Sequence, residues 1–306
     1  MYSAIIHRCR NAVGPLLERR VFFRASVFLL LVASYLPVFT LYAKQHWSSS
    51  NLQGTYAHAP LTVLLILFLV WRQRSNLTGP KPATLPLSGL VLLLGGVVLK
   101  VYGDIHGYDV LQGMSLIPVL LGLSRLYCGT NAVNALRFPV LFLFFIIPLP
   151  GAAIDAITLP LVNATASLIT GLLPLFSIEV AKTGHVLTVN AVGLPDFHEI
   201  ILAPECSGIR SFVSLIALSS VFAHLQGRNS VHATILLLTT IPLVILGNCI
   251  RVALTVIMIV YIAPETAENF FHLTSGFLLF AVTLLGLFVA DTAIKRWLPE
   301  RLSGNA

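Results

Sequence analysis

The sequence is poor in charge. Only 10% of its 306 residues are Asp, Glu, Lys or Arg, whereas 57% are hydrophobic. Soluble domains carry about 25% charged residues, so this shortage excludes an ordinary soluble domain. Apolar runs long enough to cross a membrane, which takes roughly 20 residues, recur along the chain instead. The composition predicts an all-α polytopic membrane protein in which residues 1–306 form a single integral membrane domain.

Several motifs are also absent. The four cysteines are too few and too scattered for a disulfide framework, and no Cys-x-x-Cys occurs. The chain has no His-Glu-x-x-His arrangement and no phosphate-binding glycine loop, so we expect no metal and no cofactor. The net charge of +7 is spread over short loops between apolar runs. Charge in such loops sets membrane topology, so we expect membrane lipids as partners and no nucleic acid.

About eight transmembrane helices are expected. Five spans fall within residues 22–150, and three spans that carry the candidate site fall within residues 206–294. The expected spans are Phe22–Ala43, Ala57–Trp71, Leu85–Tyr102, Val110–Leu126, Leu136–Pro150, Ser207–His224, His232–Ile262 and Phe271–Ile294. The penultimate run exceeds a simple span, so we expect it to be tilted or to break near Pro242 or Gly247.

The loops between these spans differ in charge. One set holds most of the basic residues: Arg8 to Arg20, Arg72 to Lys81, Arg125 to Arg137, Arg228, and Lys295 to Arg301. The opposite set has few Lys or Arg and several acids. Because basic loops stay in the cytoplasm, this asymmetry places both termini there.

Residues 151–205 interrupt the pattern of spans. Ala152 to Phe176 is long enough to cross, but a crossing there would move the basic C-terminus outside. It also contains Asp155 and Asn163, so an interfacial or re-entrant segment is expected. Ile178 to Ile201 alternates strand-like stretches with turn residues. The sequence therefore predicts a small strand-containing extracytoplasmic cap between the fifth and sixth spans.

The first candidate for chemistry is Cys206. Pro204 suits the first turn of a helix, which puts Cys206 at a helix N-terminus, where backbone N–H groups favour the thiolate. Arg210 follows four residues later on the same helix face and would further stabilise a thiolate. The alternative is a small buried apolar residue, the usual state of a free cysteine.

The second candidate is Arg251, which lies in an unbroken apolar run beside Asn248 and Cys249. A charged residue inside a membrane costs about 2.5–3.5 kcal/mol on insertion scales and is a functional candidate for that reason. The alternatives are an arginine that reaches the outer headgroups and an asparagine that only bonds a neighbouring helix. Cys249 is expected to face elsewhere and to pack.

The third candidate is His272, at the start of the last span. The positive end of the helix dipole favours a neutral imidazole, which can accept a proton. The alternative is an interfacial histidine that faces headgroups. In the predicted topology Cys206, Arg251 and His272 share the outer membrane level. A nucleophile, a fixed positive charge and a base at one level are suited to acyl transfer.

Three stretches resemble the exosortase/archaeosortase family of membrane transpeptidases. They are Glu205-Cys206-Ser207-Gly208-Ile209-Arg210, Asn248-Cys249-Ile250-Arg251 and His272-Leu273-Thr274-Ser275-Gly276. The resemblance implies catalysis by Cys206, Arg251 and His272, with Cys206 as the nucleophile; Arg210 and Asn248 are supporting residues. It also implies a site on the extracytoplasmic side of a bacterial inner membrane.

The expected partners follow from the same resemblance. They are exported proteins that end in a short motif such as Pro-Glu-Pro, a hydrophobic helix and a basic cluster, together with an acceptor of unknown identity at the cell surface. A different reading is a transporter or scaffold for surface polysaccharide or lipid, in which Arg251 lines a polar path and prolines mark broken helices. That reading requires acidic partners across the bundle, and the expected spans contain almost none.

Overall fold

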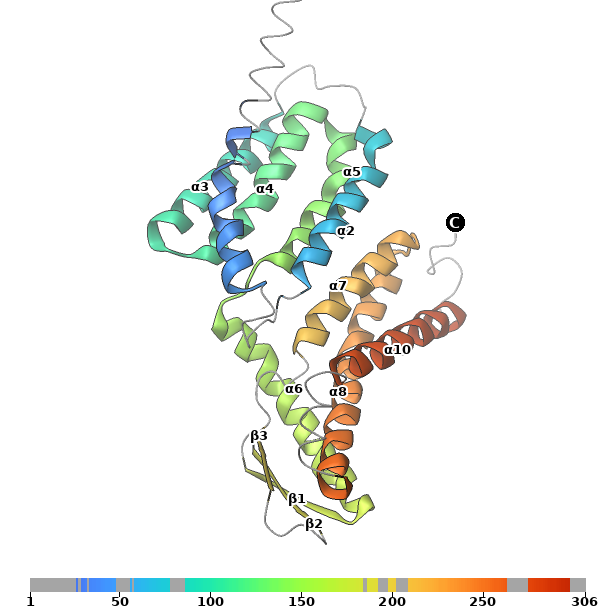
Figure 1. The fold of residues 1–306 in the computed structure, drawn as a ribbon. Coiled ribbons are helices and arrows are strands. Elements are labelled where there is room, and N and C mark those ends of the chain that lie inside the picture. Colours follow the sequence, from blue (N-terminus) through green and yellow to red (C-terminus); the bar gives the residue numbers. More distant parts are fainter. Residues whose placement is uncertain are drawn as a thin grey trace, which may run out of the picture. The chain divides into compact units, whose positions relative to one another are not determined.

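The computed structural model describes residues 26, 29–31, 33–47, 56, 58–77, 86–183, 186–191, 198–201, 209–262 and 275–297. The chain divides into two compact units. The first comprises Met1–Ser48 and Val63–Pro148, and the second comprises Ser49–Thr62 and Leu149–Ala306. Figure 1 labels their helices and strands.

The first unit is helical where it is described. It contains an apolar helix at Leu29–Gln45, most of α2 (Ala59–Arg72), η1 (Arg74–Leu77), α3 (Leu87–His106), α4 (Asp109–Cys128), α5 (Thr130–Leu141) and η2 (Phe142–Ile146). The fifth predicted span, residues 136–150, thus coincides only in part with a helix. That helix begins earlier, at Thr130, and gives way to the 3-10 turn η2 after Leu141.

Helices α3 and α4 form a close hairpin. Gly107 makes the turn between them with φ +68°, in the left-handed region that glycine adopts without strain. A Cβ atom at Gly96 would lie 2.6 Å from Cγ2 of Val119 and 2.9 Å from its backbone nitrogen. One at Gly122 would lie 2.6 Å from the backbone nitrogen of Leu93. Glycine therefore lets the two backbones approach, as is common between membrane helices.

Where it is described, the second unit combines four long helices with a small sheet. Its elements are α6 (Gly151–Leu172), η3 (Leu173–Phe176), β1 (Ile178–Thr183), β2 (Val186–Ala191), β3 (His198–Ile201), α7 (Ile209–Leu225), α8 (Ser230–Tyr261) and α10 (Ser275–Trp297). The sheet has the order β1-β2-β3, with both pairs antiparallel. It confirms the strands predicted within residues 178–201.

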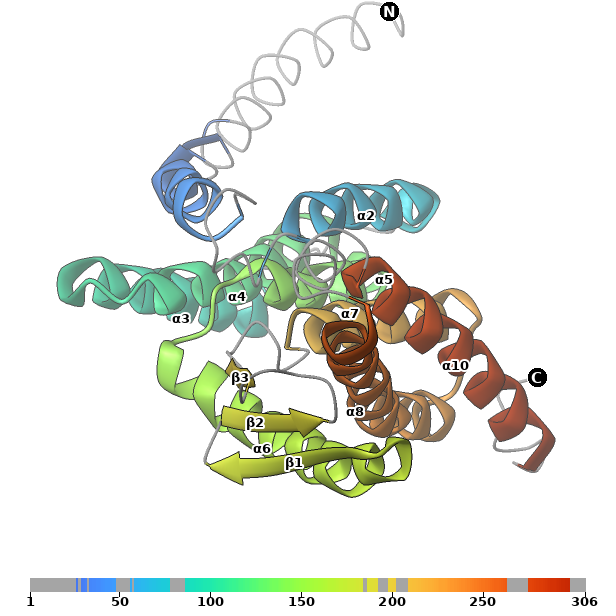
Figure 2. The ribbon, with the colours of Figure 1, turned by 60° about the horizontal axis from the view of Figure 1, so that its bottom comes forward.

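Helices α6 and α8 run side by side in the same direction (Figures 1 and 2). The amide of Asn248 donates a hydrogen bond of 3.2 Å to the hydroxyl of Thr165. Further along both helices, the hydroxyl of Tyr261 donates one of 3.0 Å to the carbonyl of Phe176. Residues of α8 thus pair with residues 83 to 85 positions earlier, which is a parallel register.

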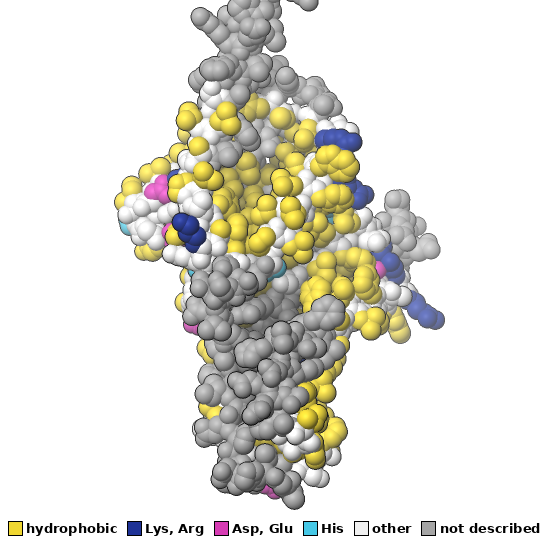
Figure 3. All heavy atoms as spheres, in the orientation of Figure 1, with side chains coloured by type: hydrophobic (Ala, Val, Ile, Leu, Met, Phe, Trp, Pro, Cys, Tyr) yellow, Lys and Arg dark blue, Asp and Glu magenta, His cyan; other side chains and the backbone are white. Residues whose placement is uncertain are grey.

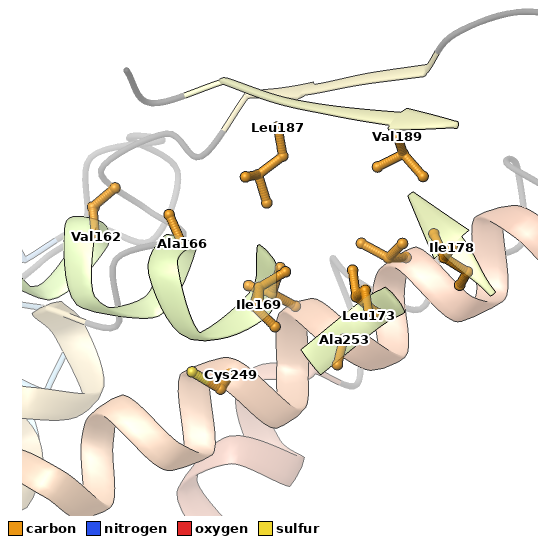
Figure 4. Close-up of a cluster of buried hydrophobic side chains, with 11 residues drawn as sticks. Val162, Ala166, Ile169, Leu173, Ile178, Leu187, Val189, Cys249 and Ala253 are labelled. Carbon is orange, nitrogen blue, oxygen red and sulfur yellow. The ribbon is translucent and has the colours of Figure 1, made fainter. Parts of the chain in front are cut away.

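The sheet packs on this helix pair. Leu187 and Val189 of β2 point toward Ile169 and Leu173 of α6, and Ala253 of α8 lies on the other side of them (Figure 4). The whole buried cluster comprises Val162, Ala166, Ile169, Leu173, Ile178, Leu187, Val189, Cys249, Val252, Ala253 and Val256. The core of this unit therefore joins α6, the sheet and the C-terminal half of α8.

Four described helices are long and apolar enough to cross a membrane: Leu87–His106, Asp109–Cys128, Gly151–Phe176 and Ser230–Tyr261. Hydrophobic side chains cover much of the described surface, and basic ones are few there (Figure 3). On α3, Leu87, Val91, Leu94 and Val98 are each more than half exposed, as lipid-facing residues should be. The predicted membrane protein is confirmed, whereas the number of eight crossings stays a prediction.

Two long helices run without interruption through a proline. Helix α8 continues for 32 residues through Pro242, so of the two expected outcomes, a tilt or a break, the break is excluded. The segment predicted to be interfacial or re-entrant is the continuous helix α6, in which Pro160 also lies inside the helix. A proline removes one backbone hydrogen bond, but packing against neighbouring helices can preserve the helical path in a membrane protein.

Candidate functional site

Arg251 lies on a buried polar face of α8. Asn248, Arg251 and Thr255 are spaced by three and four residues, so they share one side of the helix. Arg251 is 7% exposed and Asn248 is fully buried. The Thr255 hydroxyl donates a 3.0 Å hydrogen bond to the Arg251 carbonyl. Burial excludes the alternative in which the Arg251 side chain simply extends into the outer headgroups.

Helix α6 supplies the neighbouring wall of this polar face. Thr165, which is 1% exposed, accepts the hydrogen bond from the Asn248 amide. Its carbonyl lies 3.9 Å from the thiol of Cys249, which is buried in the hydrophobic core as predicted. Thr165 was not predicted as part of the site, because it is one of several polar residues in this segment, with Asp155, Asn163 and Ser167. Nothing in the sequence indicates that the segment lies against α8.

Helix α7 approaches the same level of α8. The two helices form a hairpin joined by residues 226–229, with Gly227 at φ +63° in the turn. Ile209 lies 16 residues before the end of α7, and Leu246 lies 16 residues after the start of α8. Antiparallel helices with equal rise per residue bring such positions to about the same level. The first turn of α7, which includes Arg210, is therefore near the level of Asn248.

Helix α10 also runs antiparallel to α8. Near its C-terminal end, Asp291 contacts His232 in the first turn of α8. Further back along α10, Gly286 lies against Leu243. The start of α10 at Ser275 is consequently directed toward the part of α8 that carries Arg251 (Figures 1 and 2).

Two members of the predicted catalytic set cannot be placed. Cys206 and His272 lie outside the described residues, and the side chain of Arg210 does too, although its backbone belongs to α7. Of the five predicted site residues, Arg251 and Asn248 are therefore the two whose side chains are described. Cys206 precedes the described start of α7 by three residues, and His272 precedes Ser275 by three.

A second polar cluster lies at the other end of this helix group. The carboxylate oxygens of Asp291 lie 3.2 Å from a guanidinium nitrogen of Arg228, 2.8 Å from Nε2 of His232 and 2.8 Å from Nζ of Lys295. The side chains of Arg228, His232 and Asp291 are at most 4% exposed. The cluster joins the α7–α8 turn, α8 and α10, so it fixes how these helices pack. Nothing in the sequence near Asp291 indicates Arg228 or His232 as its partners.

Within the described ranges, no group of three or more His, Cys, Asp or Glu side chains could hold a metal ion. The arrangement on α8 has a different chemical character. It offers a guanidinium and an amide, both buried, and these are hydrogen-bond donors to an oxygen atom that carries negative charge.

Comparison with known proteins assigns the family. The family model of the transmembrane exosortase (Exosortase_EpsH) matches residues 47–289. The chain belongs to the exosortase family. The match includes elements of both units and confirms the resemblance found in the sequence. No curated protein and no solved structure matches this exosortase. Members of the family act on exported proteins with C-terminal sorting signals.

Proposed function

We propose that this exosortase is a membrane cysteine transpeptidase or protease that cleaves the C-terminal sorting tails of exported surface proteins. The observation that supports the proposal most is Arg251, a guanidinium that is 7% exposed within the longest apolar helix of a family member. A charge in such a position is costly, so it is a functional candidate.

The depth of Arg251 agrees with a site at the outer surface. It lies 21 residues after Ser230, which at 1.5 Å per residue is about 32 Å along α8. The hydrocarbon core of a bilayer is about 30 Å thick. If the basic α7–α8 turn with Arg228 is cytoplasmic, Arg251 reaches the outer boundary, and the remaining turns of α8 extend beyond it with the sheet.

Contacts within the first unit indicate on which side α6 begins. The indole N–H of Trp47 donates a hydrogen bond of 3.3 Å to the carbonyl of Ile146, and a Cβ atom at Gly113, near the start of α4, would lie 3.0 Å from Cγ2 of Ile147. α5 and η2 therefore lead from the end of α4 back to the level at which α4 begins. If α4 ends in the cytoplasm, Thr130–Ile146 crosses outward as the fifth span, and α6 begins on the extracytoplasmic side.

The proposed reaction begins when the thiol of Cys206 gives its proton to the neutral imidazole of His272. The Cys206 thiolate attacks the carbonyl carbon of the scissile peptide bond and forms a C–S bond, which places negative charge on the carbonyl oxygen. Arg251 stabilises this oxyanion, and Arg210 favours the thiolate form of Cys206 before attack. His272 then gives a proton to the departing amine as the C–N bond breaks. A thioester between the substrate and Cys206 remains.

The second half of the reaction reverses these roles. An amine of the surface acceptor, or a water molecule, attacks the thioester carbonyl and loses a proton to His272. The C–S bond breaks and Cys206 leaves as a thiolate. An amine acceptor gives transpeptidation, and water gives hydrolysis. Asn248, through its hydrogen bond to Thr165, anchors the face of α8 on which Arg251 lies.

The transporter hypothesis predicts an acidic partner for Arg251. Among the described helices, the buried acidic residue is Asp291. It contacts Arg228, His232 and Lys295 near the start of α8. Arg251 is 19 residues further along that helix than His232, so Asp291 is not the partner that this hypothesis requires.

The experiment compares C206A with C128A in cells that export a reporter ending in a sorting tail from the source organism. Cys128 is a free, half-buried cysteine at the end of α4 and serves as the matched control. At equal protein abundance, C206A should leave the tail uncleaved while C128A cleaves it as the wild type does. Wild-type cleavage by C206A would contradict the proposal.

A further inference from the structure

Two buried threonines lie on the same side of α6. Thr158 and Thr165 are seven residues apart, about two helical turns, and are 3% and 1% exposed. The Thr165 hydroxyl accepts the hydrogen bond of the Asn248 amide, whereas the Thr158 hydroxyl has no partner among the described residues. The two residues therefore have the same chemistry and burial but differ in their contact with α8.

We propose that Thr165 is a positioning residue for Arg251 and acts through Asn248; this inference rests on the proposed function. Asn248 precedes Arg251 by three residues, so their side chains are neighbours on one face of α8. The hydroxyl of Thr165 fixes the orientation of the Asn248 amide, which lies on the same face of α8 as Arg251.

Two contacts at one residue of α6 also define the rotation of α8 about its axis. Asn248 meets the side chain of Thr165, and the adjacent Cys249 meets its backbone carbonyl at 3.9 Å. Because adjacent residues of a helix point about 100° apart, the two contacts together allow one rotational setting. That setting directs Arg251, and a rotation of α8 would move the guanidinium away from the developing oxyanion.

Displacement of Arg251 should lower kcat more than it changes the binding of the substrate. An oxyanion exists only after attack, so a misplaced Arg251 weakens an interaction made in the transition state. Removal of the Thr165 hydroxyl in T165V should lower kcat about ten-fold, less than the roughly hundred-fold that a misplacement of 1 Å can cost. KM for the tail should stay within about two-fold, and T165S should restore the rate.

The test measures cleavage by full-length protein in liposomes, with a peptide that contains the sorting tail of an exported protein from the source organism. T158V is the matched control, because it removes the buried hydroxyl that has no described partner; its kcat should equal that of the wild type. Wild-type kcat for T165V, or equal losses for T165V and T158V, would overturn the inference. C206A is measured alongside, because cleavage by C206A speaks against the proposed function, not against Thr165.

If T165V alone fails to fold and does not accumulate in cells, the double variant N248L/T165V can be compared with N248L. Replacement of both partners of a buried hydrogen bond by apolar groups of similar shape is close to neutral for folding, so N248L with T165V should be recovered. If Thr165 acts through Asn248, this double variant has the same kcat as N248L alone. A further loss in the double variant means that Thr165 acts by another route, and the inference is wrong.

Discussion

The hydroxyl of Tyr261 donates a hydrogen bond of 3.0 Å to the carbonyl oxygen of Phe176, 85 residues earlier in the chain. The contact joins the end of α8 to the end of the helical segment that begins with α6, so both helices finish on the same side. The last turns of α8 therefore lie beside η3, which leads directly into β1 and the region predicted to form the extracytoplasmic cap.

The first prediction concerns the two ends of α6. We expect S177C, after η3, to react with a membrane-impermeant thiol reagent in intact cells. P150C, at the exposed proline before α6, should also react from outside, because Ile146 and Ile147 lie by Trp47 and Gly113 at the outer level of the first unit. Q226C in the α7–α8 turn is the cytoplasmic control. All three are made in a chain whose own cysteines are replaced. Labelling of P150C only after the cytoplasmic side is opened would mean that Thr130–Ile146 does not cross.

The second prediction concerns Arg251. Lysine keeps the positive charge but lacks the planar fork of hydrogen-bond donors, so R251K should not replace an arginine that binds an oxyanion. We expect R251A and R251K each to lower kcat by about 10²- to 10³-fold, the usual effect of losing one oxyanion donor. R296A, at an exposed arginine of α10, should cleave the tail at the wild-type rate. Full activity of R251K would show that only charge is needed.

Local features of the sequence were enough to predict several elements. Arg251 was identified because a charge is rare in an apolar run, and the structure buries it, while its catalytic role stays a prediction. The strands within residues 178–201 were predicted because turn residues separate β-prone stretches, and the sheet confirms them. In both cases the signal lies within a few neighbouring residues.

Contacts between distant segments could not be predicted in this way. Nothing near Thr165 in the sequence indicates Asn248, and nothing near Asp291 indicates Arg228 or His232. These pairs depend on which helices pack together and in which direction. The positive-inside rule fixed the direction of α8 but gave no direction for α6, whose flanking segments carry little basic charge.

The third prediction concerns the buried ion cluster. D291N would leave the buried Arg228 and the neighbouring Lys295 without a counter-charge. Breaking a buried pair in this way costs about 3–5 kcal/mol, so the thermal unfolding midpoint in detergent should fall strongly. D104N removes an acid from the more exposed Lys100–Asp104 pair and should cost less than about 1 kcal/mol. Equal midpoints for D291N and D104N would show that the cluster does not stabilise the helix packing.

The fourth prediction uses two adjacent glycines of α3. A Cβ atom at Gly96 would meet Val119 of α4 at 2.6 Å, whereas one at Gly95 would have no atom within 4 Å. G96A should therefore force the α3–α4 hairpin apart at a cost of about 1–3 kcal/mol. G95A should be neutral or should stabilise the helix by up to about 1 kcal/mol, because alanine favours helix more than glycine does. Thermal unfolding of the two variants in detergent gives the comparison. A lower midpoint for G95A than for G96A would mean that the close contact of α3 with α4 is not where the structure places it.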